Sequence, residues 1–210
     1  MIKILVADDH AVVRNGLKQI VGDTSDIVIA AEASNGQEAL NKALKDDYDI
    51  VLLDITMPDR SGLDILKEIK SQKPELPVLI LSIHPEEQYA VRALKAGAAG
   101  YLTKESAPEE LIRAMRSVSA GGKYVTPSLA ERLASVLKTG AEEPLHQSLS
   151  DREYQILCMI ASGKSVKQIA DELLLSIKTI STYRARLLRK MNMNNNIELT
   201  RYAIQNQLVS

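Results

Sequence analysis

Side chains that can bind metal ions or phosphate follow several apolar runs of this sequence. Asp8 ends the first run and Asp9 follows it, and Asp54 ends the run "IVLLD". A hydroxyl, Ser82, ends "PVLILS", and an ammonium, Lys104, ends "GYLTK". A buried carboxylate is costly unless it is paired or binds a cation. Asp54 is therefore either a simple turn residue at the end of a strand or a group whose negative oxygen is needed there.

Three carboxylates close together repel one another unless a cation lies between them. Mg²⁺ prefers oxygen ligands and typically uses one or two carboxylates while keeping places for water and phosphate. A carboxylate can itself accept a phosphoryl group. We therefore predict that Asp54 is a phosphoacceptor beside a Mg²⁺ ion held by Asp8 and Asp9. Lys104 and Ser82 would contact the phosphoryl oxygens.

The elements that would position these residues alternate along residues 1–120. Five apolar runs alternate with stretches that have apolar residues at helical spacing, which predicts an α/β fold with a doubly wound, five-stranded parallel sheet. Ligands of such sheets bind beyond the carboxyl ends of the strands. The acids, the serine and the lysine should thus meet at one edge. The apolar runs are 2–8, 27–33, 50–54, 77–82 and 100–104.

Domain organisation follows from the loss of this alternation. Residues 121–148 contain Gly122, prolines and a short helical piece near 128–137, so we predict a linker with one helix. Residues 149–210 have only helical patterns and should form a small all-α domain. Residues 150–210 carry nine basic and five acidic side chains, a net +4, which leaves −5 for residues 1–149. Two domains of opposite charge are therefore expected.

Composition excludes several classes of protein. Hydrophobic residues make up 45% of the chain and charged residues 25%, as in ordinary globular proteins. The single cysteine, Cys158, lies in the apolar run "ILCMI" and should be a core residue. The N-terminal apolar run is too short for a signal peptide, and no segment approaches the length of a membrane helix. We expect a cytoplasmic protein that does not engage a membrane.

The C-terminal helices have the pattern of a helix-turn-helix. Ser150 and Glu153 are spaced as a capping box, Ser165 and Gln168 as a second one, and Ser176 should cap a third helix. If Ile180 points inward, four other apolar side chains of that helix share its face, and a basic face lies opposite. The inward set is Tyr183, Leu187, Leu188 and Met191, and the outward set is Lys178, Thr182, Ala185, Arg186 and Arg189, with Ser181 at the border. Long cations with small side chains between them fit the major groove of DNA.

The first 120 residues resemble the receiver domain of two-component response regulators, a flavodoxin-like fold. The matching pieces are "VADDH", "VLLDITMPDRSGL", "LILS" and "GYLTK", in order. The resemblance implies that a sensor histidine kinase phosphorylates Asp54. It assigns Mg²⁺ to Asp8, Asp9, Asp54 and the backbone carbonyl of Thr56. It also implies that Lys104 contacts the phosphate and that Ser82 and Tyr101 rearrange on phosphorylation, with Tyr101 turning inward.

The segment "LSDREYQILCMIASGKSVKQIADELLLSIKTISTYRARLLRKM" resembles a LuxR-type DNA-binding domain. The whole chain is thus similar to NarL/FixJ-type response regulators. This implies double-stranded DNA, a homodimer formed on activation through a last helix at about 197–206, and RNA polymerase as a candidate partner. Ala185 stands where several relatives carry a polar or basic base-reading residue, which moves the expected base contacts to neighbouring positions. The expected DNA-binding residues are Lys178, Thr179, Ser181, Thr182, Arg184, Arg186 and Arg189, with Arg184 reaching the edge of the helix.

Two other functions fit these residues less well. A phosphatase would use Asp54 as a turnover nucleophile, but it would usually have a second acid two residues later, where this chain has Thr56. A binding protein that ignores phosphate would not need the acid cluster and Lys104. We therefore expect a transcription regulator and not an enzyme, with a receiver that catalyses only its own phosphotransfer and dephosphorylation.

Overall fold

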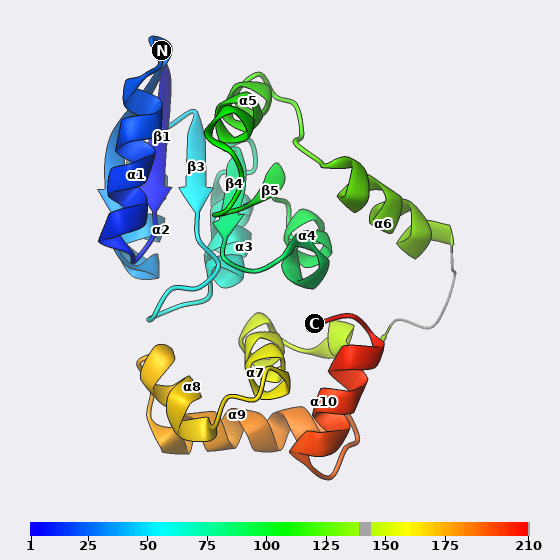
Figure 1. Cartoon of the computed structure of the whole chain (residues 1–210). Helices are drawn as coiled ribbons and strands as arrows, with labels where there is room; N and C mark the ends of the chain where they lie inside the picture. Colours follow the sequence, from blue (N-terminus) through cyan, green and yellow to red (C-terminus); the bar gives the residue numbers. More distant parts are fainter. Residues whose placement is uncertain (139–143, 210) are drawn as a thin grey trace. The chain divides into compact units, whose positions relative to one another are not determined.

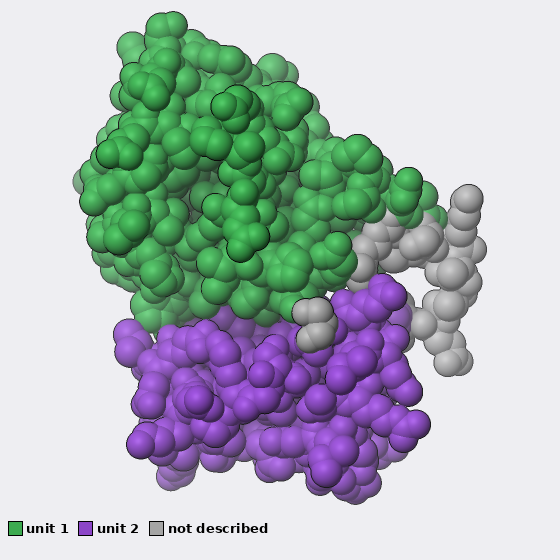
Figure 2. Space-filling view, viewed as in Figure 1, with its two compact units in different colours: residues 1–134 green, residues 135–210 purple. Residues whose placement is uncertain are grey.

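The computed structural model describes residues 1–138 and 144–209. The chain forms two compact units, residues 1–134 and 135–210, coloured separately in Figure 2. The division falls inside the segment 121–148 that the sequence predicts to be a linker, and the helix α6 (Pro127–Lys138) lies there. The boundaries predicted for the two domains stay predictions.

The first unit is a five-stranded parallel sheet in the order β2-β1-β3-β4-β5, with helices on both faces (Figure 1). The predicted α/β fold is thus confirmed. Each strand lies within one residue of the run that predicted it. The strands are β1 (Ile2–Ala7), β2 (Ile27–Ala33), β3 (Ile50–Leu53), β4 (Val78–Ser82) and β5 (Gly100–Thr103). The helices are α1 (Ala11–Gly22), α2 (Gly36–Lys45), α3 (Gly62–Gln72), α4 (Glu86–Lys95) and α5 (Pro108–Ser119).

The sheet has a core on both faces because its central strands are buried on both sides. All four residues of β3 and all five of β4 are buried. One face packs against α1 and α5, whose buried side chains join those of the strands in a single cluster. Helices α2, α3 and α4 cover the other face (Figure 1). A continuous apolar run is what a strand covered on both faces requires.

The second unit is helical, as predicted, with α7 packed against α9 and α10 and with α8 packed against α9. Both predicted capping boxes are present, at Ser150 with Glu153 and at Ser165 with Gln168. The Ser176 side chain caps α9 by accepting a hydrogen bond from the Thr179 backbone N–H. The elements are η1 (Leu145–Ser148), α7 (Asp151–Ala161), α8 (Val166–Glu172), α9 (Ile177–Lys190) and α10 (Asn196–Gln205).

The predicted inward face of α9 is also confirmed. Ile180 and Leu187 are fully buried, Met191 is 1% exposed, and Tyr183 and Leu188 are half-buried. This apolar stripe packs on α7 and α8 and leaves the opposite side of α9 open. Cys158 is buried, as expected. Among the described residues, no helix is both long and apolar enough to cross a membrane.

Gly62 controls how closely the loop after β3 approaches the strand. Its backbone N–H donates to the Ile55 carbonyl at 2.8 Å, and a Cβ atom at this position would lie 2.0 Å from the Asp54 backbone oxygen. A side chain here would therefore push the loop away from the carboxylate at the end of β3. Gly16, in the middle of α1, differs, because a Cβ atom there would have no neighbour within 4 Å.

These two glycines give opposite predictions. We expect Gly62→Ala to destabilise the chain by about 2–3 kcal/mol, because the methyl group overlaps backbone atoms. Gly16→Ala should instead stabilise it by about 0.5–1 kcal/mol, because alanine is the better helix former. Urea unfolding of the full chain followed by circular dichroism measures both. Equal effects of the two substitutions would contradict the close approach at Gly62.

Candidate functional site

The candidate site lies at the carboxyl edge of the sheet. Backbone hydrogen bonds between neighbouring strands hold Asp8 and Asp54 there. The Asp8 backbone N–H donates to the Ala33 carbonyl of β2 at 3.1 Å, and that of Asp54 donates to the Ala7 carbonyl of β1 at 2.9 Å. Both aspartates are 2% exposed. The parallel ladder therefore fixes two buried carboxyl groups side by side, as the order of the strands requires.

One ammonium group joins the two acids. Lys104 Nζ lies 2.6 Å from Asp8 Oδ2 and 2.7 Å from Asp54 Oδ2. The residue follows β5, and its backbone N–H donates to the Ser82 carbonyl at 2.8 Å, which places it beside the end of β4. The structure thus brings together Asp8, Asp54 and Lys104 from strands that are far apart in the sequence.

The charges at this edge are not balanced. Burial raises the pKa of Asp54 to about 6, and the nearby Asp8 carboxylate also raises it, although the charge and hydrogen bond of Lys104 act in the opposite direction. Burial alone would lower the pKa of Lys104, but the attraction of Asp54 and Asp8 outweighs it, so that pKa is raised. Lys104 is therefore charged at neutral pH, yet one cation does not suffice for the surrounding carboxylates.

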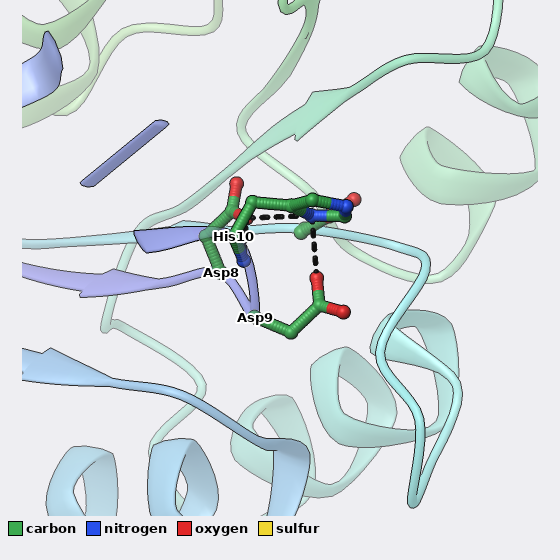
Figure 3. A group of neighbouring side chains, drawn as sticks. Asp8, Asp9 and His10 are labelled. Carbon is green, nitrogen blue, oxygen red and sulfur yellow. Dashed lines mark hydrogen bonds and ion pairs between the residues drawn. The ribbon is translucent and has the colours of Figure 1, made fainter. Parts of the chain in front are cut away.

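The side chains present fit a metal ion that prefers oxygen. Asp8, Asp9, His10 and Asp54 each offer one ligand atom, and these atoms all lie within 4.8 Å of one another. Asp8 Oδ2 and Asp9 Oδ1 are buried oxygens that have ion-pair contacts but accept no regular hydrogen bond in the described part of the chain. His10 Nδ1 lies 2.8 Å from Asp9 Oδ1 and 3.3 Å from Asp8 Oδ1 (Figure 3). The acidic cluster could therefore bind a hard cation, with His10 as a neighbour of the carboxylates.

Three sets of hydrogen bonds hold the loop between β3 and α3 in place. The Thr56 backbone N–H donates to Asp54 Oδ1 at 3.0 Å, and the Gly62 N–H returns to the end of β3. The Asp59 carboxylate accepts hydrogen bonds from the Gly36 and Gln37 N–H groups at 2.7 and 2.8 Å, at the start of α2. These contacts hold the stretch that contains the Thr56 carbonyl, which the family resemblance assigns as a metal ligand.

The two predicted switch residues meet at His84. The His84 backbone N–H donates to Ser82 Oγ at 3.2 Å, and the Tyr101 hydroxyl donates to the His84 carbonyl at 2.8 Å. The His84 side chain reaches back toward the site, with Nε2 at 3.1 Å from Thr56 Oγ1. Tyr101 is fully buried, which is the inward orientation that the resemblance assigns to the phosphorylated form.

The candidate DNA-binding residues lie along α9. Lys178, Ser181, Thr182, Arg186 and Arg189 are exposed. The Thr182 hydroxyl donates to the Lys178 carbonyl at 2.9 Å, so its proton is used within the helix and its oxygen can only accept from a partner. Thr179 is half-buried, and its side chain contacts the Ser176 cap at 2.8 Å. The contacts of Thr182 and Thr179 do not show that either side chain reaches a DNA base. The set of DNA-binding residues stays a prediction.

Arg184 differs from the other candidate cations of α9. It is half-buried, and its Nε donates to Asn196 Oδ1 of α10 at 2.6 Å. The sequence predicts that this side chain reaches the edge of the helix, and the structure shows which group it meets there. Its guanidinium therefore links α9 to α10, and a DNA contact by Arg184 stays a prediction.

Two residues that support the site are not evident from the sequence. Asp59 caps α2 from a loop that is 23 positions away, and Arg14 donates to the Asp8 backbone carbonyl at 2.7 Å. The only signal for Asp59 is an acid in a turn-rich stretch. Arg14 gives a weaker signal, because a cation in the second turn of a helix has many possible partners.

The raised pKa of Asp54 predicts a gain in stability when its charge is removed. In Mg²⁺-free buffer at pH 7.5, we expect Asp54→Asn to stabilise the chain by about 1–3 kcal/mol, since each pKa unit corresponds to about 1.4 kcal/mol. The folded wild type retains the proton more strongly than the unfolded chain. Its stability should therefore fall as the pH rises from about 4 through about 6, and the gain of the variant should vanish below about pH 4.

Urea unfolding across this pH range measures the effect. Asp47→Asn is the matched control, because that side chain is fully exposed. A variant at position 54 that is less stable than the wild type at pH 7.5 would contradict an uncompensated charge.

Comparisons with known proteins agree with this geometry. The response regulator receiver domain family matches residues 4–116, and the family of bacterial regulatory proteins called luxR matches residues 147–203. The response regulator UvrY of Escherichia coli K12 is 37% identical over 209 residues, which cover 99% of this chain and 96% of UvrY. The response regulator GacA of Pseudomonas aeruginosa is 36% identical over 210 residues, which cover 100% of this chain and 98% of GacA.

The chain is also similar to a solved structure of two RcsB dimers bound to two parallel DNAs, with 25% identity and a TM-score of 0.61. The match covers 100% of this chain and 99% of the RcsB chain. The families are families of regulators, which confirms that the chain is not a phosphatase. With a receiver domain, a luxR-family domain and relatives that match over nearly their full lengths, the chain belongs to the NarL/FixJ-type response regulators of two-component systems.

Proposed function

We propose that this response regulator is switched by phosphorylation of Asp54 and that the switch changes dimerisation and DNA binding. The observation that carries the proposal is the buried Asp54 carboxylate, held by Lys104 beside a second buried carboxylate. The donor would be a phosphohistidine of a sensor kinase. RNA polymerase, as a candidate partner at a promoter, stays a prediction.

Phosphotransfer needs little covalent help from the protein, because most of the catalysis comes from positioning and charge neutralisation. An Asp54 carboxylate oxygen would form a bond to phosphorus while the phosphorus–nitrogen bond of the donor breaks. Lys104 would stabilise the phosphoryl oxygens, since its ammonium already contacts Asp54 Oδ2. The Ser82 hydroxyl, at the end of β4, would donate a hydrogen bond to another phosphoryl oxygen.

The metal proposed for this site is Mg²⁺, held by Asp8, Asp9, Asp54 and the Thr56 backbone carbonyl. The three clustered carboxylates and the buried oxygens of Asp8 and Asp9 support this assignment. Bound there, Mg²⁺ would neutralise the negative charge of the carboxylates and of the arriving phosphate. The unbalanced charge of the cluster is the reason that the site needs such an ion.

Phosphorylation would act on the rest of the receiver through Ser82, His84 and Tyr101. A hydrogen bond from Ser82 to the phosphoryl group would hold the start of the β4–α4 loop, whose His84 carbonyl accepts from Tyr101. Phosphate would favour the inward arrangement of Tyr101 to the extent that its bond to Ser82 is stronger in that arrangement than in others. The surface near α4 and β5 would change with it.

The DNA-binding part of the proposal depends on α9. Its exposed face carries Lys178, Arg186 and Arg189, with Ser181 and Thr182 between them. RcsB, which matches the whole chain, has been solved as dimers on DNA. A homodimer would place two such helices on one operator, and the second contact would benefit from a high effective concentration.

The switch is tested with Mg²⁺ and acetyl phosphate. We expect the intact mass of the full chain to increase by one phosphoryl group, and the affinity for a duplex selected from a random-sequence pool to rise about tenfold. Asp54→Asn should show neither change, while Asp47→Asn should behave like the wild type. Fluorescence anisotropy measures the DNA affinity. Phosphate on another residue, or DNA binding that ignores phosphate, would overturn the proposal.

The DNA face is tested by salt dependence. Lys178→Ala should weaken binding to selected and random duplexes by equal factors and lower the slope of log K against log salt by about one, because a phosphate contact releases counterions. Ser181→Ala should affect the selected duplex more than the random one, since base contacts carry specificity.

The control for both substitutions is Lys45→Ala, which removes an exposed cation of α2. Lys178→Ala with an unchanged slope would remove that residue from the DNA contact. A Ser181→Ala effect that is equal on both duplexes would exclude base reading at that position.

A further inference from the structure

Arg14, in the second turn of α1, contacts both the proposed metal site and the neighbouring strand. Its Nη1 donates to the Asp8 backbone carbonyl at 2.7 Å, and its Nε donates to Glu32 Oε2 of β2 at 3.2 Å. The side chain is only 17% exposed. One guanidinium thus joins the carboxyl end of β1 to that of β2.

The contact completes the set of bonds that hold Asp8. The Asp8 N–H donates to the Ala33 carbonyl, and Oδ1 accepts from the His10 N–H at 2.8 Å. Oδ2 lies beside the Lys104 ammonium. The backbone carbonyl is the remaining polar group, and Arg14 supplies its partner. The direction of this carbonyl sets the peptide plane between Asp8 and Asp9, and with it the position of the Asp9 N and Cα atoms.

The charge of Arg14 is largely balanced by Glu32. Lys18 Nζ lies 2.6 Å from Glu32 Oε1, on the other oxygen of the same carboxylate. Hydrogen bonding with Lys18, together with that of Arg14, holds the pKa of Glu32 below its usual range, so this carboxylate is ionised at neutral pH. Lys18 and Arg14 therefore share one acidic partner, but of these two cations Arg14 is the one that donates to Asp8.

We propose that Arg14 is a positioning residue for the metal site, which fixes the Asp8–Asp9 turn so that both carboxylates face one Mg²⁺ ion. This inference rests on the proposed function. A guanidinium donates from a rigid fork and so holds a carbonyl and a carboxylate in a fixed relation, whereas the ammonium of a lysine, on a flexible stem, restrains them less. Groups that orient the ligands of a metal typically change its affinity by roughly 10–100-fold.

The sign of the effect separates positioning from charge. Removal of a cation near the site would strengthen Mg²⁺ binding if charge alone mattered. Loss of the bond to the Asp8 carbonyl would weaken it. Arg14→Met removes both the charge and the bond, and Arg14→Lys keeps the charge but loses the fork. Lys18→Met removes a cation from the same Glu32 and leaves the Arg14 bond to Asp8 in place.

The experiment titrates MgCl₂ into the full chain by calorimetry and follows the thermal midpoint in parallel. We expect Arg14→Met to raise the Mg²⁺ dissociation constant about tenfold, and Arg14→Lys to raise it by about half as much on a logarithmic scale. Lys18→Met should leave it unchanged or slightly lower. At saturating Mg²⁺, the rate of phosphate uptake by Arg14→Met from acetyl phosphate should return close to that of the wild type.

Asp8→Asn distinguishes failure of the proposed function from failure of the positioning role of Arg14. If the wild type shows no Mg²⁺ binding that Asp8→Asn removes, the proposed function itself is wrong at this site. If the wild type binds Mg²⁺ there and Arg14→Met and Arg14→Lys bind it equally well or more tightly, only the positioning role is wrong. Arg14→Lys decides the question if Arg14→Met does not fold, and midpoints measured without Mg²⁺ show whether either variant has lost stability in general.

Discussion

The organisation of the first unit depends on an unbalanced charge. Asp8 and Asp54 are buried at the end of adjacent strands, and the Lys104 ammonium contacts both. Buried carboxylates in contact with too few cations retain protons, which is why the pKa of Asp54 rises. Such a cluster has lower free energy with a divalent cation than without one. In the proposed function, the same excess of negative charge would make the site receptive to a cation and, through it, to a phosphoryl group.

Holding repelling groups together requires a rigid surrounding structure. The parallel ladder fixes the backbone of Asp8 and Asp54, and the loops beyond the strands are tied down by side chains from other elements. Asp59 binds the start of α2, Gly62 allows the β3–α3 loop to approach the strand end, and Arg14 binds the Asp8 carbonyl. Each contact restrains a backbone group and not a reacting atom. In the proposed function, metal and phosphate would therefore bind and leave while this frame stays in place.

The sequence predicted those features that depend on local periodicity. The strands, the capping boxes at Ser150 and Ser165 and the inward face of α9 follow from alternation, cap residues and helical spacing. The supporting contacts do not follow, because they depend on which side chains meet after folding. Asp59 finds its partner 23 residues away, and Arg14 finds Glu32 at a separation of 18. The orientation of Tyr101 was also beyond reach, since a side-chain rotamer is selected by its surroundings and not by its position in a strand.

The inward orientation of Tyr101 bears on how the proposed switch could work. Its hydroxyl bonds a backbone carbonyl of the β4–α4 loop, the same loop that binds Ser82 through a backbone N–H. One loop carries both bonds, so a contact that holds Ser82 also acts on the loop that Tyr101 binds. A ligand shifts an equilibrium between two states only by the difference in its affinity for them. In the proposed mechanism that difference is the hydrogen bond between Ser82 and the phosphoryl oxygen, together with the loss of the Lys104 contact to the free carboxylate. The ratio of the two states before phosphorylation would then set how much DNA binding occurs without a signal.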